Sequence, residues 1–491
     1  MFATYFTFGL YLLVMLGIGI YCYFKSKGVE DYLLGGRGVG SWVTALSAQA
    51  SDMSGWLLMG VPGLIYLSGL CNMYVAIGLW IGTLLNWLLV APRLRLYTAA
   101  TKSLTLSSFF GRRFRDRTGI LRLFSAIVVL LFFTIYSASG LVAAGKLFNS
   151  MFGINYQLAV LIGAGVMLFY TSMGGYLAVC WTDLLQGMLM FFALLIVPVT
   201  AYFRLPPDAA EIFRATNPGA LNLLAADKST VFALAAVVSA AVWGLGYFGQ
   251  PHILVRFMSI KSVSALPRAI WIAMIWVTVS LTAAVLIGLL AIPLYPGLAQ
   301  GESEKVLIFM IGDFFNPWIG GILLAAILAA IMSTIDSQLL VASSTLTADF
   351  YKNILRKKAS SAEQMHVSRV FVLLITVIAL IMALNPGKTI FELVTFAWGG
   401  FGAAFGPVVL MALYSRKTSW QSALCGMAAG TIVMIGWYVS GLGAYMYEIL
   451  PGFIAGLTAI IAVNRIRPET NEKVLAEFDK VEQQLRDAKK K

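Results

Sequence analysis

The sequence predicts an all-α polytopic membrane protein with about thirteen transmembrane helices, and three observations predict it. Hydrophobic residues make up 59% of the 491 residues, charged residues only 12%, and the mean hydropathy is +0.84, which is outside the range of soluble globular chains. The apolar residues form long continuous runs, whereas a β-barrel would show alternation in segments of about ten residues. Basic residues gather in alternate short loops between the runs.

Each predicted span is an apolar run long enough to cross a bilayer, which takes roughly 20 residues. In chain order the spans are expected at 4–24, 40–68, 72–92, 121–148, 156–179, 181–204, 230–249, 269–295, 317–345, 369–386, 388–413, 421–441 and 446–463. These spans form a single transmembrane domain, 1–463, and a polar tail follows at 464–491. Val474, Phe478, Val481 and Leu485 recur in the tail at 4-3-4 spacing, which predicts a short amphipathic helix. This helix is either a solvated tail with a basic end or a contact for the membrane surface or a partner.

The basic loops predict the orientation of the chain. The net charge is +13, and its carriers lie in alternate short loops, which is the pattern of the positive-inside rule rather than of a nucleic-acid-binding surface. We therefore expect the N-terminus outside and the C-terminus in the cytoplasm. Representative basic residues of the predicted cytoplasmic loops are Arg37, Arg112, Arg256, Lys357 and Arg416.

Two spans are interrupted by glycines and polar residues. Span two contains the run Ser51-Asp52-Met53-Ser54-Gly55, and span seven ends in the glycine-rich run 243–251. The two breaks begin successive blocks of five spans, 40–204 and 230–413, and the second block enters the membrane in the opposite sense. Interrupted spans at matching places of inverted repeats indicate the central site of a secondary transporter. Span one and the two spans of 421–463 would be peripheral.

Asp52 is the costliest residue of the first break. A carboxylate at the centre of a span costs roughly 2.5 to 3.5 kcal/mol on insertion scales, and such acids by default mark ion or substrate pathways. An unwound helix also frees carbonyl oxygens that suit a hard cation. The alternative is a glycine-facilitated kink, which would not explain the carboxylate.

Two further polar or aromatic clusters lie inside spans. Ser333 and Thr334 of span nine offer adjacent hydroxyl oxygens to an ion such as Na⁺, although such residues also bond helices together. Trp243 and Tyr247 are four residues apart and predict an aromatic wall with polar tips, or an interfacial aromatic belt. Asp183, at the predicted start of span six, is expected to act as a helix N-cap or first-turn acid near the cytoplasmic interface.

Five segments together resemble bacterial sodium/proline symporters of the sodium/solute symporter family. They are TALSAQASDMSGWLLMG at 44–60, FFTIYSASG at 132–140, WGLGYFGQPHIL at 243–254, ILAAIMSTIDSQLLV at 327–341 and FGAAFGPVVL at 401–410. The resemblance extends over essentially all thirteen spans. It implies the leucine-transporter-type 5+5 inverted-repeat fold and a location in the bacterial inner membrane.

The resemblance also implies the site residues. Sodium would be bound between spans two and nine by backbone oxygens of Ala50, Met53 and Ala330 and by the hydroxyls of Ser333 and Thr334, with Asp52 near the site. The residues that would bind proline are Ser54, Gly55, Trp56, Tyr136, Trp243, Tyr247 and Pro251. Asp183 matches a family acid implicated in function. Gln49 and Asp336 depart from the family pattern: Gln49 could crowd or polarise the cavity, and Asp336 could attract a second cation or pair with a basic loop residue.

The expected function is secondary active transport that couples inward Na⁺ flow to L-proline uptake by alternating access. A Na⁺-coupled symporter for another small solute, such as a different amino acid or pantothenate, remains open, and a membrane solute sensor is a more distant alternative. The chain is not expected to be an enzyme, because no nucleophile with an adjacent base stands out. The expected partners are proline, Na⁺ and membrane lipid, with no nucleic acid and no obligate protein partner.

Overall fold

The computed structural model of the chain describes residues 2–25, 33–173, 175–224, 230–385 and 387–490, and across them the chain is almost entirely helical. A parallel bridge between Val39 and Ile260 is the one β-type contact found there. The helices that form the bundle and its C-terminal tail are α1 (Phe2–Lys25), α3 (Ser41–Asp52), α4 (Val61–Ser68), α5 (Tyr74–Leu85), α6 (Ala91–Ala100), α8 (Ile120–Phe152), α9 (Tyr156–Met173), α10 (Tyr176–Phe203), α12 (Thr230–Ala241), α13 (Pro251–Ser259), α14 (Leu266–Leu294), α17 (Pro317–Thr345), α18 (Ser361–Leu384), α19 (Ile390–Tyr414), α20 (Trp420–Val439), α21 (Ile449–Ile466) and α22 (Glu472–Lys490).

The predicted fold class is confirmed, and the count of thirteen spans is approximate. Among the described residues, eleven helical stretches are long and apolar enough to cross a membrane, and one bent pair raises the number to twelve. The apolar part of α9, Tyr156–Phe169, is shorter than the others. It occupies the place of the fifth predicted span.

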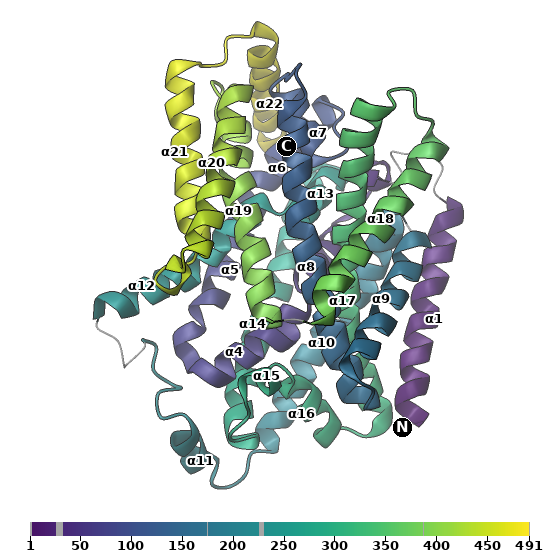
Figure 1. Cartoon of the computed structure of the whole chain (residues 1–491), viewed down its shortest axis with the longest axis vertical. Helices are drawn as coiled ribbons and strands as arrows, with labels where there is room; N and C mark the ends of the chain where they lie inside the picture. The colour runs from purple at the N-terminus through teal and green to yellow at the C-terminus, as the bar shows by residue number, and fades with distance from the viewer. Residues whose placement is uncertain (1, 26–32, 174, 225–229, 386, 491) are drawn as a thin grey trace.

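Figure 1 shows the long helices running between two ends of the molecule. One end carries the N-terminus and the short helices α11 (Ala209–Thr216), α15 (Gln300–Ser303) and α16 (Val306–Phe314). The opposite end carries α6, α7 (Leu106–Arg113) and the C-terminal α22. We refer to them as the N-terminal end and the C-terminal end of the bundle.

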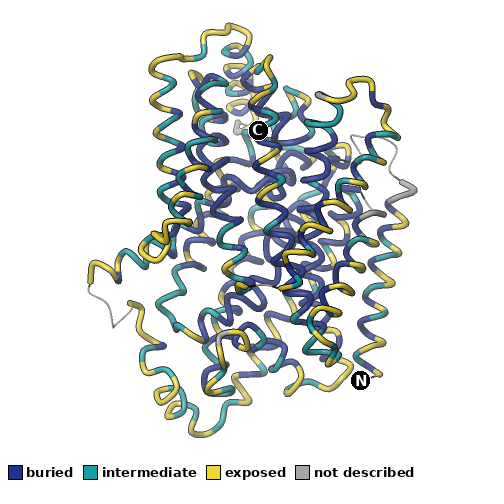
Figure 2. Tube along the Cα trace, viewed as in Figure 1, coloured by how far each residue is buried: buried dark blue, intermediate teal, exposed yellow. Residues whose placement is uncertain are grey.

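Burial separates central helices from peripheral ones. In its most apolar window α17 has 83% of its residues buried, and α19 has the same share, whereas α21 has only 28%. Figure 2 shows the same contrast, with the buried trace concentrated in the middle of the bundle. The polar residues of α17 therefore lie in the protein core and not against lipid, which is where intramembrane polar groups are tolerated.

Close backbone contact holds α5 against the second broken span. A Cβ added to Gly82 would lie 2.3 Å from the carbonyl oxygen of Gly244, and one added to Gly78 would lie 2.0 Å from the carbonyl oxygen of Ala241. Small residues at such crossings let two helix backbones approach closely, which is a usual basis of helix association in membranes.

The predicted boundary between spans five and six is wrong. We expected it between residues 179 and 181, but α9 ends at Met173 and α10 begins at Tyr176, with Gly175 as its N-cap. The run is apolar on both sides of the break, so hydropathy alone does not locate it. Asp183 is consequently the eighth residue of α10 and not a helix cap.

The predicted amphipathic tail helix is confirmed as α22, and its apolar side packs inside the protein. Val474, Phe478, Val481 and Leu485 are all buried, and α22 contacts α6. Arg416, in the connection after α19, forms an ion pair of 2.9 Å with Asp479. The tail is thus neither a freely solvated segment nor an apolar face left open for a membrane or a partner.

Candidate functional site

The first predicted break is present in the structure. Helix α3 ends at Asp52, and Met53 leaves the helical region with φ −82° and ψ 82°. The chain resumes as a π-helical turn, η2 (Trp56–Gly60), and continues into α4, with a bend of 59° between the two halves. A break of this kind exposes carbonyl oxygens inside the bundle, where only a polar cavity or a ligand makes it tolerable.

The second predicted break is also present, and the span continues beyond it. After α12 the chain forms a 3₁₀ segment, η5 (Val242–Gly249), then one extended residue, Gln250, and then α13. Pro251 occupies the first turn of α13, where its missing N–H costs nothing. Our prediction ended this span at residue 249, so it wrongly placed the buried residues of α13 in a loop.

Four of the five predicted Na⁺ ligands meet between α3 and α17. The Ser333 hydroxyl donates to the carbonyl oxygen of Ala50 at 2.6 Å and lies 3.1 Å from that of Ala330. The Thr334 hydroxyl lies 3.4 Å from the same Ala50 oxygen. All four residues are buried. Such a cluster of carbonyl and hydroxyl oxygens is chemically suited to a hard, weakly charged cation.

The carboxylate of Asp52 has a partner that the sequence did not suggest. The Tyr247 hydroxyl donates to its Oδ2 at 2.6 Å, across the two broken spans. Its Oδ1 is buried and has no hydrogen-bond partner among the described residues. Asp52 comes two residues after Ala50 of the oxygen cluster. One of its carboxylate oxygens links the two breaks through Tyr247, and the other is free to accept a hydrogen bond or contact a cation.

Trp56, Trp243 and Tyr247, among the residues expected to bind solute, lie in one aromatic cluster. The Trp56 and Trp243 ring centroids are 6.4 Å apart, and the Trp56 indole N–H donates to the Asp52 carbonyl oxygen at 2.9 Å. Tyr247 packs edge-on against Trp398, with ring centroids 5.0 Å apart. These rings are buried, so the aromatic-belt alternative is wrong for Trp243 and Tyr247.

The other expected solute residues border this cluster from neighbouring elements. Tyr136 of α8 is buried, its hydroxyl has no hydrogen-bond partner among the described residues, and its ring lies edge-on to His252. Gly55 packs against α8, where an added Cβ would lie 2.8 Å from that of Ala143. Ser54 is buried in the first break, and its hydroxyl oxygen accepts from the backbone N–H of Trp56 at 3.4 Å.

Comparison with known proteins identifies the family. The model of the sodium:solute symporter family matches residues 32–430, which is well over half of the chain. The chain belongs to the sodium:solute symporter family. It is 45% identical over 470 residues to the high-affinity proline transporter PutP of Bacillus subtilis, covering 95% of this chain and 98% of that protein. It is 46% identical over 465 residues to the sodium/proline symporter of Escherichia coli, covering 93% and 91%.

Solved structures support the same fold. A Na⁺-coupled sialic acid symporter in a substrate-bound, outward-open state aligns with a TM-score of 0.79 at 20% identity, covering 96% of this chain and 99% of that one. MhsT in complex with L-phenylalanine aligns with a TM-score of 0.55 at 16% identity, covering 86% and 97%. The leucine-transporter-type fold of this symporter-family chain is therefore confirmed, although likeness at these identities does not assign its site residues.

Asp183 of this symporter-family chain is a buried ion-pair partner and not a cap near the interface. Its Oδ2 accepts from the Arg256 guanidinium at 3.0 Å and from the Ser47 hydroxyl at 2.6 Å. Arg256 also donates to the Ser337 hydroxyl at 2.6 Å and to the carbonyl oxygen of His252 at 2.7 Å. This network, which we call the buried ion-pair network, joins α3, α10, α13 and α17.

Gln49 and Asp336 lie in the core, and among the described residues neither forms an ion pair or hydrogen bond with a basic side chain. The Thr171 hydroxyl of α9 donates to Asp336 Oδ1 at 2.5 Å, so pairing with a basic loop residue is not seen. The Gln49 Oε1 and the Asp336 Oδ2 have no hydrogen-bond partner among the described residues. Both are buried polar atoms of the kind that normally have a partner or a bound ligand.

Sequence reasoning missed several residues of the core. Arg256 and His252 were assigned to a cytoplasmic loop, yet both are buried. We assigned Arg256 to a loop because it is charged. Its partner, Asp183, lies 73 residues earlier in the chain, and only the folded structure brings the two together. Ser337 could have been found, because it is four residues after Ser333 and so lies on the same face of α17.

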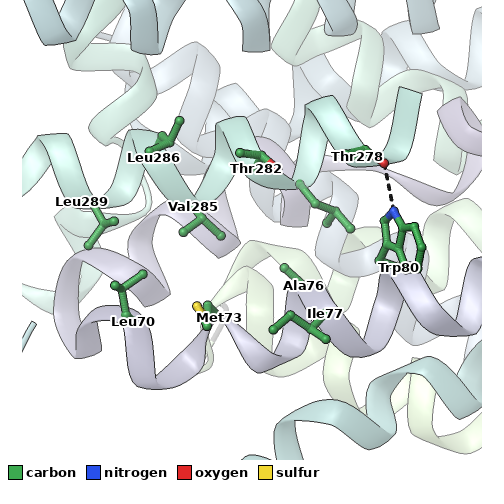
Figure 3. A pocket seen from close by; sticks show the side chains of 11 residues that line it. Leu70, Met73, Ala76, Ile77, Trp80, Thr278, Thr282, Val285, Leu286 and Leu289 are labelled. Atoms are coloured by element: carbon green, nitrogen blue, oxygen red, sulfur yellow. Dashed lines mark hydrogen bonds between the residues drawn. The ribbon is translucent and has the colours of Figure 1, made fainter. Parts of the chain in front are cut away.

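An apolar groove elsewhere on the symporter is separate from these polar residues. It has a volume of about 400 Å³ and lies between α5 and α14. Figure 3 shows side chains of the two helices facing each other across it, with the Trp80 indole N–H donating to the Thr278 hydroxyl at one end. Its lining is Leu70, Met73, Ala76, Ile77, Trp80, Thr278, Leu281, Thr282, Val285, Leu286 and Leu289, with no charged group to bind an ion or a zwitterion.

Proposed function

We propose that this protein couples the inward movement of Na⁺ to the uptake of L-proline by alternating access. The observation that carries the proposal is the buried oxygen cluster of Ala50, Ala330, Ser333 and Thr334, which joins a break in one half of the bundle to α17 in the other. The names of relatives at 42–46% identity, most of them sodium/proline symporters, support this solute and this ion.

In the proposed site, Na⁺ binds to backbone oxygens of Ala50, Met53 and Ala330 and to the hydroxyl oxygens of Ser333 and Thr334. Each hydroxyl donates its hydrogen to the carbonyl oxygen of Ala50 and keeps lone pairs on its oxygen that a cation can use. Bound Na⁺ would then tie the first break to α17. Asp52 adds negative charge near the site. Because its carboxylate accepts a hydrogen bond from Tyr247, a shift of Asp52 on ion binding would also move the second break.

Proline would bind beside this ion, between the two breaks. The aromatic rings of Trp56, Trp243 and Tyr247 supply apolar surface for a pyrrolidine ring, and the unpaired Tyr136 hydroxyl supplies a hydrogen bond. Ser54 and Gly55 would contribute polar backbone and hydroxyl groups from the first break, while Pro251 fixes the start of α13. Gln49, Asp183 and Asp336 would have supporting roles in coupling.

The proposed arrangement in the bacterial inner membrane follows the basic loops. The N-terminal end of the bundle faces outside, and the C-terminal end, with α7 and α22, faces the cytoplasm. The repeats 40–204 and 230–413 rock against each other around the site, and the remaining spans are peripheral. Lipid and the two solutes are the partners that this mechanism requires.

The electrical driving force is sufficient for useful accumulation. One charge that moves inward through 100 mV yields about 2.3 kcal/mol. That energy corresponds to a roughly fifty-fold concentration ratio before any chemical Na⁺ gradient is added.

The test uses purified protein in liposomes with an inward Na⁺ gradient. We expect radiolabelled proline to accumulate with external Na⁺ and not with external choline. Equal accumulation with the two cations would contradict Na⁺ coupling. A panel of unlabelled amino acids and pantothenate, added as competitors, distinguishes proline from the other solutes, because the true substrate must compete most strongly.

A further inference from the structure

A polar cavity lies at the C-terminal end of the bundle, away from the proposed transport site. It has a volume of about 760 Å³, which is within the range of small-ligand sites, roughly 300 to 1,000 Å³. Residues of α7, of the connection from α7 to α8 and of the first turns of α22 line it. The lining is Thr101, Gly111, Arg112, Arg115, Asp116, Arg117, Arg122, Asn471, Glu472, Lys473 and Glu477. We call it the basic cavity.

Basic side chains outnumber acidic ones in the basic cavity by five to three. One of the acids, Asp116, is occupied by the start of α8. Its Oδ1 accepts from the backbone N–H and the hydroxyl of Thr118 at 2.8 and 2.6 Å, and its Oδ2 accepts from the backbone N–H of Leu121 at 3.0 Å. Glu477 lies 3.6 Å from the Arg115 guanidinium. The acids therefore leave an excess of positive charge in the cavity.

Two of the basic residues, Arg117 and Lys473, have no anionic partner within the described part of the chain. No hydrogen bond or ion pair from either side chain is found there, and both residues are exposed. They come from different elements, since Arg117 precedes α8 and Lys473 belongs to α22. Replacing them removes charge from the cavity without breaking a contact of the fold.

Arg112 and Arg122 bring two further guanidinium groups into the basic cavity. One nitrogen of Arg112 donates to the carbonyl oxygens of Thr101, at 2.7 Å, and of Lys102, which fixes the position of this guanidinium group. Arg122 lies 3.6 Å from a carboxylate oxygen of Asp349. Burial lowers the pKa of Arg112, and the positive charge of Arg122 lowers it further. An anion bound beside the two groups would offset this repulsion.

An apolar stripe on α8 begins at the edge of the basic cavity. Ile120, Ile127 and Leu131 are 49%, 54% and 41% exposed, and their spacing of seven and four places them on one face of the helix. Ile120 stands between Arg117 and Arg122 in the chain. An amphiphile with its anionic head in the cavity would therefore find apolar surface for its chains, whereas a free anion would use the basic groups alone.

We propose that the basic cavity binds the phosphate-bearing headgroup of an anionic phospholipid, whose acyl chains lie along the apolar stripe of α8. Guanidinium groups suit this ligand because they can donate two parallel hydrogen bonds to a phosphate. Clusters of roughly four to eight basic residues beside a membrane span are typical of sites for anionic lipids. The inference goes beyond the proposed function and does not depend on which solute or ion is transported.

The test titrates the purified full-length protein in dodecyl maltoside with phosphatidylglycerol, and native mass spectrometry measures the affinity for the first bound lipid. We expect phosphatidylglycerol to bind more tightly than phosphatidylcholine, whose headgroup carries a phosphate but no net charge. The double variant Arg117→Gln/Lys473→Gln should weaken the binding of phosphatidylglycerol at least about tenfold, because both charges attract an anionic lipid.

Lys357→Gln/Lys358→Gln is the matched control. It removes the same charge from exposed side chains at the same end of the bundle, in the connection before α18, and neither residue lines the cavity. We expect it to leave the affinity for phosphatidylglycerol unchanged. An affinity of Arg117→Gln/Lys473→Gln within twofold of wild type would overturn the inference, and so would equal weakening in the control.

Competition with inorganic phosphate distinguishes a lipid from a free anion. We expect millimolar inorganic phosphate to displace little phosphatidylglycerol from the wild-type protein, because the acyl chains add apolar contacts that phosphate lacks. Complete displacement would assign the basic cavity to free phosphate and overturn the lipid as its ligand. Equal affinities for phosphatidylglycerol and phosphatidylcholine would likewise overturn it.

Discussion

The buried ion-pair network makes a strong energetic prediction, because Arg256 and Asp183 are both fully buried in the core. The perturbation is a set of three variants: Asp183→Leu, Arg256→Met and the two together. Arg256 makes hydrogen bonds to four groups, and Asp183 accepts two, so each single variant removes a charge and leaves its partner uncompensated.

The magnitudes differ sharply between single and double variants. Breaking a buried pair by removing one partner costs about 3 to 5 kcal/mol, whereas replacing both partners by apolar residues of similar size is often close to neutral. Ser47 and Ser337 would each lose a charged partner at 3.1 and 2.6 Å, so we expect a residual cost of about 1 to 2 kcal/mol in the double variant. The two single losses together should therefore exceed the loss in the double variant by about 4 kcal/mol or more, which is the interaction energy of the cycle.

The assay is equilibrium unfolding of the purified protein in mixed detergent micelles with increasing dodecyl sulfate. Each variant is compared with wild type by its free energy of unfolding, so the amount expressed does not enter the result. If the double variant lost as much stability as the two single variants added together, the pair would not be coupled, and the reasoning about this network would be refuted.

Three other predictions follow from packing and hydrogen bonds. Gly82→Ala should destabilise the fold by about 1 to 3 kcal/mol in the same unfolding assay, because its Cβ meets the Gly244 backbone, while Gly436→Ala, which has nothing within 4 Å, should not. Phe478→Ser should release α22 and speed tryptic cleavage of the tail, whereas Gln484→Ser, at an exposed position, should leave cleavage unchanged. Tyr247→Phe removes a 2.6 Å hydrogen bond to Asp52 and should raise the Na⁺ concentration for half-maximal uptake about tenfold; no change would exclude that contact from coupling.

The sequence predicted features that depend on local chemistry. Asp52, beside glycine and serine inside an apolar run, indicated a break in the helix, and the structure has one. The 4-3-4 spacing of apolar residues indicated α22. In the first case the pattern is the cost of a carboxylate inside an apolar span, and in the second it is the helical spacing of apolar residues. Both can be recognised from neighbouring residues alone.

Long-range pairing could not be predicted in this way. Tyr247 contacts Asp52 over a separation of 195 residues, and Arg256 contacts Asp183 over 73. Hydropathy assigns the same value to an arginine in the core and to one in a loop. It therefore could not distinguish the two for Arg256, which was wrongly placed in a cytoplasmic loop. The docking of α22 on α6 likewise depends on a surface that exists only after the bundle has formed.

The central claim is that Na⁺ binds between α3 and α17 at Ser333 and drives proline uptake. The most direct measurement is the Na⁺ concentration for half-maximal proline uptake in liposomes by wild type and by Ser333→Ala, with Ser343→Ala on the same helix as the matched control. We predict at least a tenfold increase for Ser333→Ala, since it removes one of the five proposed oxygen ligands, and no change for the control. An unchanged Na⁺ dependence in Ser333→Ala would contradict the claim.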